Sequence, residues 1–191
     1  VAALGPVLRP YLDMADLVFL QQAPTFNKEA ANIYQGAIQD KGGTLKKDEV
    51  VFPSEGETFG KIRIASVGIE ASLIYGDNIK NMRKGVEVYS GTYLPGEDRT
   101  ILIGGHNNTH FRTLKNVKTG DKVELQTNYG TYIYEVTGSR IARFDDTSAY
   151  DLTRAEENLI LYTCYNESKI GATPNRTFVY GKYVSGPKIV S

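Results

Sequence analysis

The stretch KVELQTNYGTYIYEV, residues 122–136, decides the fold class of this 191-residue chain. Residues 122–127 and 131–136 are rich in β-branched and aromatic side chains, which favour extended strands. Between them, residues 128–130 contain an asparagine and a glycine, which are turn formers. The stretch therefore predicts an antiparallel β-hairpin.

Further runs of the same kind flank this hairpin on both sides. They span residues 61–65, 69–74, 100–103, 158–163 and 177–184. Turn residues and irregular segments separate them, and among these we predict a short helix at 78–84 and loops at 92–99 and 144–151. Many short strands broken by turns are typical of an antiparallel barrel or sandwich, so the chain is predicted to be mainly β.

The N-terminal segment has a different pattern. Leu4, Leu8 and Leu12 recur at helical spacing, and residues 27–39 contain good helix formers before two glycines end the run. We therefore expect a helical appendage over residues 1–45 and one β domain over residues 46–191.

Composition and charge exclude several classes of function. Lysine plus arginine number 22, as do aspartate plus glutamate, so no net field attracts nucleic acid or an anionic membrane. Cys164 is the only cysteine, which rules out an intramolecular disulfide. No apolar run reaches the roughly 18 residues that span a bilayer, and the sequence begins at Val1, so we expect a membrane anchor upstream of it.

Three segments carry chemically active side chains at the ends of predicted strands. The segment ILIGGHN delivers His106 after two glycines, whose small size lets a substrate or another backbone approach. The segment LILYTC ends in Cys164, and the segment PNRTFV begins the last strand with Arg176. If the last two strands are neighbours, Cys164 and Arg176 meet at one cleft, and His106 needs only a neighbouring strand end.

A thiol, an imidazole and a guanidinium form a coherent catalytic set. The imidazole supplies thiolate character or protonates a leaving amine, and the permanently charged guanidinium donates hydrogen bonds to substrate carbonyls and to an oxyanion. Taken singly, each residue has a simpler explanation, namely a buried cysteine, a hydrogen-bonded loop histidine and an edge-strand cation. For His110, the other histidine, packing is favoured over catalysis.

Taken together, these motifs resemble the sortase family, the cysteine transpeptidases that attach proteins to the Gram-positive cell surface. The elements that carry the resemblance are, in order, Gly105-His106, residues 111–114, Gly120-Asp121, residues 129–136, Thr163-Cys164 and Arg176. Residues 163–165, 170–176 and 89–97 are most similar to class D, although Asn166 stands where class D commonly has proline. The lid typical of pilin-polymerising class C enzymes is not seen in the N-terminal sequence, which implies an open site.

The resemblance implies a sortase-like closed β-barrel of about eight strands with short helices and an N-terminal helical segment. It assigns Cys164 as the nucleophile, His106 as the general acid and base, and Arg176 as the stabiliser of substrate and oxyanion, with Thr163 lining the site. The sorting signal needs an apolar groove between the flanking loops. Its candidate walls are Ala149, Tyr150, Leu152 and Ile170.

The resemblance also implies a reaction and partners. Cys164 attacks an LPxTG-like sorting signal to form a thioacyl enzyme, which an amine of a peptidoglycan precursor then resolves. No organic cofactor or metal is implied, and no nucleic acid. The expected location is the extracellular face of the membrane of a Gram-positive bacterium.

Other functions stay open at this point. A pilin-polymerising sortase would use a lysine of another surface protein as acceptor, and a cysteine protease would use water. A non-catalytic surface module that binds peptide or glycan would keep Cys164 buried and inert. The reactivity of the thiol and the response of turnover to added amine discriminate among these functions.

Overall fold

Strands β6 (Lys122–Thr127) and β7 (Thr131–Arg143) form the antiparallel hairpin that the sequence predicts. The Thr127 amide donates to the Gly130 carbonyl at 2.8 Å and closes the turn. The computed structural model describes residues 43–76, 78, 80–165 and 173–191. The helices predicted before residue 43 lie outside the described residues.

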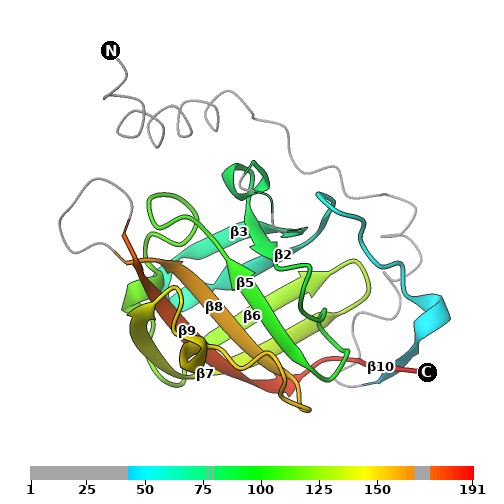
Figure 1. Ribbon diagram of the computed structural model, residues 1–191. Coiled ribbons are helices and arrows are strands. Elements are labelled where there is room, and N and C mark those ends of the chain that lie inside the picture. Colours follow the sequence, from blue (N-terminus) through cyan, green and yellow to red (C-terminus); the bar gives the residue numbers. More distant parts are fainter. Residues whose placement is uncertain (1–42, 77, 79, 166–172) are drawn as a thin grey trace.

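Eight strands close into a barrel in the order β2-β3-β4-β5-β8-β9-β7-β6 (Figure 1). The remaining barrel strands are β2 (Thr58–Ile64), β3 (Ile69–Tyr75), β4 (Val86–Val88), β5 (Thr100–Gly104), β8 (Asn158–Cys164) and β9 (Asn175–Ser185). Strands β1 (Thr44–Lys46) and β10 (Lys188–Val190) form a separate parallel pair. Short 3-10 helices lie at Lys47–Glu49, Ala65–Val67, Asn81–Arg83, Leu114–Asn116 and Thr147–Ala149. The mainly β, closed-barrel prediction is confirmed.

Four strands differ most from the prediction. Strand β7 continues to Arg143, well past residue 136, because a register shift against β9 between Val136 and Gly138 accommodates one extra residue without ending the ladder. Strands β1, β4 and β10 have three residues each and were not predicted. Runs that short contain no usable periodicity, so tertiary pairing alone defines them.

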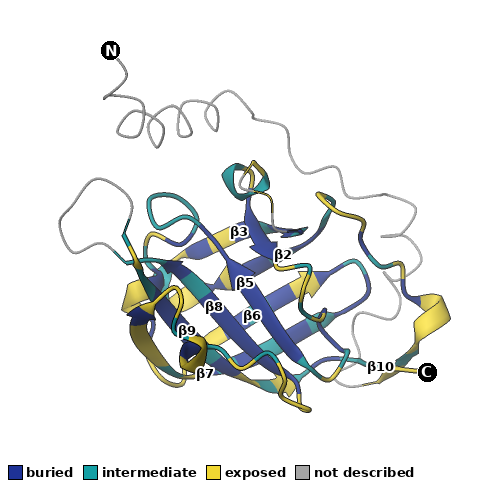
Figure 2. Ribbon diagram, in the orientation of Figure 1, coloured by how far each residue is buried: buried dark blue, intermediate teal, exposed yellow. Residues whose placement is uncertain are grey.

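The buried apolar residues form two clusters, and the buried stretches of the barrel strands are dark blue in Figure 2. Leu159 and Leu161 of β8 belong to the cluster inside the barrel, whereas Ile160 packs with Leu102 and Phe178 in a second cluster. The β7–β8 connection contributes Ala149 to the second cluster. Because β8 is buried on both faces, its sequence is a continuous apolar run.

Strands β5, β8 and β9 lie side by side and position the candidate site (Figure 1). The β5 and β8 strands are parallel, and β8 and β9 are antiparallel. The carboxyl ends of β5 and β8 and the start of β9 therefore share one rim of the barrel. No helix within the described residues is long and apolar enough to cross a membrane.

Candidate active site

Cys164 and Arg176 are directly opposite each other in the β8–β9 ladder. Cys164 is the last residue of β8, and Arg176 is the second residue of β9. Opposite residues of an antiparallel pair share a face of the sheet and have Cβ atoms about 5 Å apart. Cys164 is half-buried. The structure therefore brings these two predicted residues together at the barrel rim.

His106 follows β5 and continues its alignment with β8. Gly104 pairs with Tyr162, and the Gly105 amide donates to the Tyr162 carbonyl at 3.2 Å. Carrying this parallel register two residues further places the His106 backbone beside that of Cys164. The Phe111 amide donates to the His106 carbonyl at 3.0 Å and closes the following turn. The three predicted residues are thus supplied by three adjacent chain segments.

The two glycines before His106 make room for aromatic rings. A Cβ on Gly104 would lie 2.6 Å from the Tyr162 ring, and a Cβ on Gly105 would lie 2.7 Å from the Phe111 ring. The two small residues predicted that a substrate or another backbone would use this space. The structure instead assigns it to two side chains that pack against the strand leading to His106.

Thr163 joins the strand of the thiol to that of the imidazole. Its side chain is buried, and its hydroxyl donates to the Gly105 carbonyl at 2.7 Å. The hydroxyl therefore holds the backbone of β8 against the residue that precedes His106. Thr163 does not line the apolar groove described below, although it does border a smaller cavity beside Cys164.

The Arg176 guanidinium is held in one orientation. Its Nη1 donates to the carbonyls of Thr173 at 2.6 Å and Asn175 at 2.9 Å. The Phe144 ring lies against the same group, with 5.9 Å between the guanidinium carbon and the ring centroid. Within the described residues neither Nε nor Nη2 has a hydrogen-bond partner, so their N–H groups can serve a ligand.

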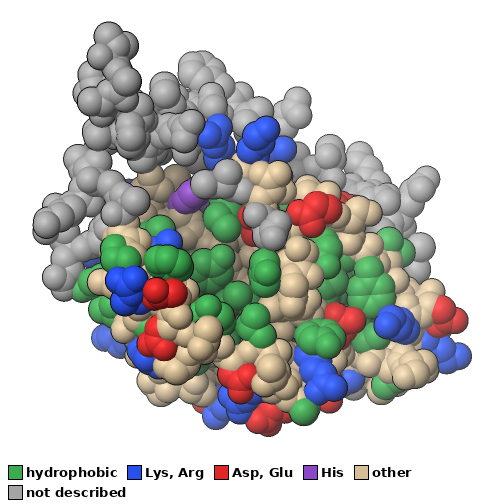
Figure 3. Space-filling view, viewed as in Figure 1, with side chains coloured by type: hydrophobic (Ala, Val, Ile, Leu, Met, Phe, Trp, Pro, Cys, Tyr) green, Lys and Arg blue, Asp and Glu red, His purple; other side chains and the backbone are tan. Residues whose placement is uncertain are grey.

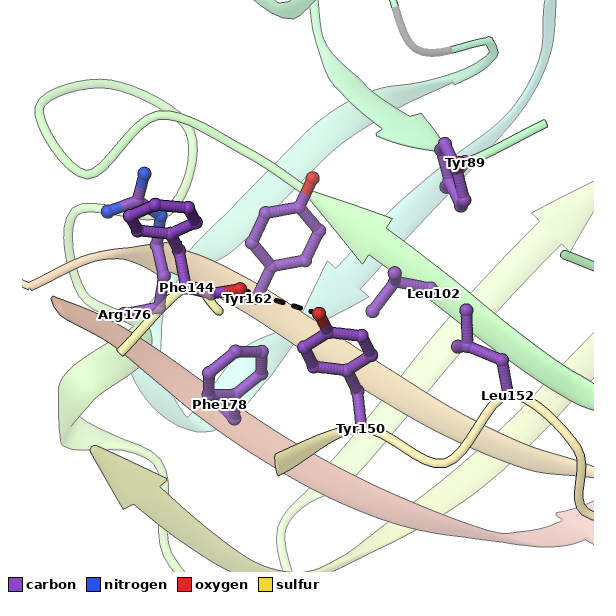
Figure 4. A pocket seen from close by; sticks show the side chains of 8 residues that line it. All are labelled: Tyr89, Leu102, Phe144, Tyr150, Leu152, Tyr162, Arg176 and Phe178. Atoms are coloured by element: carbon purple, nitrogen blue, oxygen red, sulfur yellow. Dashed lines mark hydrogen bonds between the residues drawn. The ribbon is translucent and has the colours of Figure 1, made fainter. Parts of the chain in front are cut away.

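An apolar groove of about 290 Å³ runs from Arg176 along the outer face of β8 and β9 (Figure 4). The Phe178 ring stacks between those of Tyr150 and Tyr162, with centroid distances of 5.9 and 6.2 Å. Hydrophobic side chains gather on this face of the molecule in Figure 3. The lining residues are Tyr89, Leu102, Phe144, Tyr150, Leu152, Tyr162, Arg176 and Phe178. This lining suits an apolar peptide segment.

The predicted groove residues are placed in different ways. Tyr150 and Leu152 line the groove. Ala149 does not, because it is only 1% exposed and packs in the layer beneath, where its carbonyl accepts from the Tyr180 hydroxyl. Ile170 lies outside the described residues.

The aromatic rings of Tyr162 and Phe178, which line the groove, were not predicted from the sequence. Tyr162 precedes Cys164 by two residues and Phe178 follows Arg176 by two, so the two-residue period of a strand puts them on the same face as the site. That signal was available in the sequence. Burial raises the pKa of Tyr162, with Arg176 opposing the shift, so its hydroxyl is protonated near pH 7.

His110 lies in the turn after His106, away from the groove. Its Nε2 is 3.4 Å from the Arg83 carbonyl, and burial lowers the pKa of the imidazole. The structure places it as a packed, neutral histidine. Among the described residues, no cluster of three or more His, Cys, Asp or Glu side chains is arranged to hold a metal ion.

Comparisons with known proteins agree with this fold. The sortase domain family matches residues 62–184. A curated relative, Sortase D of Bacillus subtilis, is 35% identical over 160 residues, which cover 83% of this chain and 81% of the relative. This chain belongs to the sortase family, whose members are cysteine transpeptidases. Within that family, it is similar to Sortase D.

Solved structures share the fold at lower identity. A Clostridium perfringens Sortase D5 transpeptidase aligns with a TM-score of 0.62 at 20% identity, over 84% of this chain and 90% of that one. Sortase A of Listeria monocytogenes aligns with a TM-score of 0.59 at 24% identity, over 70% and 92%. Sortase C of Clostridium perfringens, solved with its C-terminal cell wall sorting motif, has a TM-score of 0.61 at 22% identity, over 92% and 90%.

Proposed function

We propose that this sortase cleaves an LPxTG-like sorting signal through a thioacyl intermediate on Cys164 and transfers the acyl group to an amine of a peptidoglycan precursor. The observation that carries the proposal is the register that aligns His106, Cys164 and Arg176 on three adjacent segments. The half-buried thiol opposes the interpretation as an inert binding module. The bacterial cell surface is the corresponding location.

The apolar groove would hold the acyl side of the signal. The leucine and proline of the motif bury apolar surface against the Tyr150, Phe178 and Tyr162 rings, with Leu152 at the wall. This arrangement directs the scissile carbonyl toward the end of the groove where Arg176 and Cys164 lie. The N–H groups of Arg176 Nε and Nη2 donate to the substrate carbonyls and to the oxyanion.

The reaction then has two acyl transfers. Cys164 gives up its proton to His106, and its Sγ bonds to the threonine carbonyl carbon. The peptide C–N bond breaks, and His106 passes the proton to the departing amine. In the second step an incoming amine attacks the thioester and gives up a proton to His106. The C–S bond breaks, and the thiol returns to its starting state.

Mass spectrometry tests the nucleophile and the substrate class together. Incubation with an LPxTG-like peptide should add the mass of the acyl half of the peptide to the wild type and add nothing to Cys164→Ala. Cleavage by both proteins alike would disprove the proposal. A scrambled peptide of the same composition controls for non-specific acylation.

Amine dependence separates transpeptidation from the alternatives. Faster turnover and a ligated product on addition of a peptidoglycan-type amine support the proposal, whereas hydrolysis that ignores amine indicates a protease. A product joined through a lysine of another surface protein, formed in preference, would indicate pilin polymerisation.

Substitutions test whether the apolar groove binds the sorting signal. Leu152→Gln should slow cleavage of the peptide because it places a polar group where the signal needs apolar surface. Val184→Gln is a matched control, since Val184 is an exposed aliphatic residue of β9 outside the groove. Equal rates for the two variants would remove the groove from the proposal.

A further inference from the structure

A second, smaller cavity borders Cys164 and shares no lining residue with the apolar groove. It has a volume of about 130 Å³. The groove is bordered by Tyr162 and Arg176 on the outer face of the strands, whereas the second cavity is bordered by Thr163 and Thr177, which alternate to the opposite face. The full lining is Asn107, Phe111, Arg112, Lys115, Thr163, Cys164, Tyr165 and Thr177.

Two cations border this second cavity. Arg112 and Lys115 both line it, and none of its lining residues within the part of the chain that the structure describes is acidic. Within the described residues neither cation has a salt-bridge partner, whereas Lys122, Arg140 and Lys188 each pair with a carboxylate. The aromatic side of Phe111 adds an apolar wall. A small ligand carrying an anionic group is the natural complement.

The reaction at Cys164 indicates the identity of this anionic ligand. The acyl half of the sorting signal occupies the groove, so the amine that attacks the thioester must approach Cys164 from the other side of the carbonyl. A cavity of about 150 Å³ holds a molecule the size of benzene, which is comparable to the amine-bearing end of one amino acid. The second cavity therefore has the position and size for the acceptor amine.

We propose that the second cavity binds the acceptor and that Arg112 and Lys115 select an amine whose neighbouring carbon carries a carboxylate. This inference rests on the proposed function and names the class of its second substrate. The carboxylate pairs with the two cations while the amine nitrogen attacks the thioester carbon. The C–N bond forms, the C–S bond breaks, and the proton of the amine passes to His106.

A matched pair of amines tests the selectivity. Diaminopimelate and 1,5-diaminopentane have the same carbon spacing between amines and differ by the two carboxylates. With the thioacyl enzyme formed from an LPxTG-like peptide, we expect aminolysis by diaminopimelate to be faster by roughly tenfold, the scale of one charge-assisted hydrogen-bonded contact. The preference should shrink as salt is added, because both cations are exposed.

Variants locate the origin of that preference. Arg112→Ala combined with Lys115→Ala should remove most of the advantage of diaminopimelate, and the loss should fall on aminolysis. Lys118→Ala, which removes an exposed lysine of the same segment that does not line the cavity, should keep the wild-type preference. A preference that survives in the double variant, or that the wild type never shows, would overturn the inference. Equal slowing of acylation would assign the cavity to the departing part of the signal instead.

A measurement without any sorting signal keeps the two proposals separate. Diaminopimelate bound beside Cys164 should slow alkylation of the thiol by iodoacetamide, more than 1,5-diaminopentane does, and only while Arg112 and Lys115 are present. If no thioacyl enzyme forms but this protection is seen, the proposed substrate fails and the anion-selective cavity stands. Absence of protection together with absence of preference refutes the cavity alone.

Discussion

The two ends of strand β8 handle charge in opposite ways. At its start, the side chain of Glu157 is 1% exposed, accepts from the Tyr134 hydroxyl and the Gly96 amide, and pairs with Lys188 at 2.8 Å. At its end, Arg176 beside Cys164 bonds only backbone carbonyls, and no carboxylate partner exists for it within the described residues. About seven residues of strand, some 20 Å, separate the two ends.

The difference shows which charges serve the fold and which serve a ligand. The Glu157 end ties β10 to the barrel, because Lys188 also reaches Asp98, and burial raises the pKa of Tyr134 so that its hydroxyl stays a donor. Glu157, Tyr134 and Lys188 each have a partner within the chain. At the Cys164 end, Arg176 keeps N–H groups without a partner among the described residues, and we propose that these serve the substrate. The predictions below test this division.

Arg176→Ala should give the largest effect, a loss of roughly 10²–10³ in kcat/KM for a sorting-signal peptide, as expected for removing an oxyanion donor. The melting temperature should change little, because no carboxylate is left unpaired. Arg176→Lys should recover little of the rate, since an ammonium lacks the planar fork of donors. Arg154→Ala, at an exposed position outside the groove, is the control. A fall in melting temperature large enough to explain the lost activity would contradict this prediction.

Glu157→Gln should act the opposite way and cost about 3 kcal/mol of stability, the low end for breaking a buried pair. The low end applies because Lys188 keeps Asp98 and is partly exposed. Urea denaturation measures the loss, and activity per folded molecule should stay near wild type. A large loss of rate with unchanged stability would show that the two ends are coupled.

Gly104→Ala should cost about 1–3 kcal/mol, the range for overpacking a well-packed site. A Cβ there would lie 2.6 Å from the Tyr162 ring, whereas the Gly138→Ala control adds its methyl to open space. Combining Gly104→Ala with Tyr162→Ala should add less than the sum of the two losses, because the clash disappears. Additive losses in thermal unfolding would mean that the ring does not occupy this space.

Much of the fold and of the candidate site could be predicted from the sequence. The paired strands followed from their β-branched runs. Cys164 and Arg176 are twelve positions apart, which was enough to place both at one rim because adjacent antiparallel strands bring such residues together. Tyr162 and Phe178 could have been found by the same two-residue period. The bulge in β7 and the three-residue β4 depend on tertiary pairing and carry no local signal.

Replacing Phe144 should have a smaller effect on the acylation rate, because its ring acts only through Arg176. Its exposed ring lies against the guanidinium, a contact worth about 0.5–1 kcal/mol at an exposed site, so Phe144→Leu should slow acylation roughly two- to fivefold by that energy. Phe144→Tyr keeps an aromatic face and should restore the rate, which a purely structural role would not require. An equal rate for all three proteins would show that the ring does not position Arg176.

Replacing His110 should give the smallest effect, a small change in how the free energy of unfolding depends on pH. Burial lowers the pKa of this imidazole in the folded state, so below the ordinary value of about 6.5 the unfolded chain binds the extra proton first. Stability contributed by the neutral ring is therefore full above that pH and is lost as the pH falls toward the lowered value. His110→Gln should flatten the stability profile just below about pH 6.5, as followed by urea denaturation. An unchanged slope in that window would assign the dependence to other groups, and a slope of opposite sign would mean that the folded protein favours the charged ring.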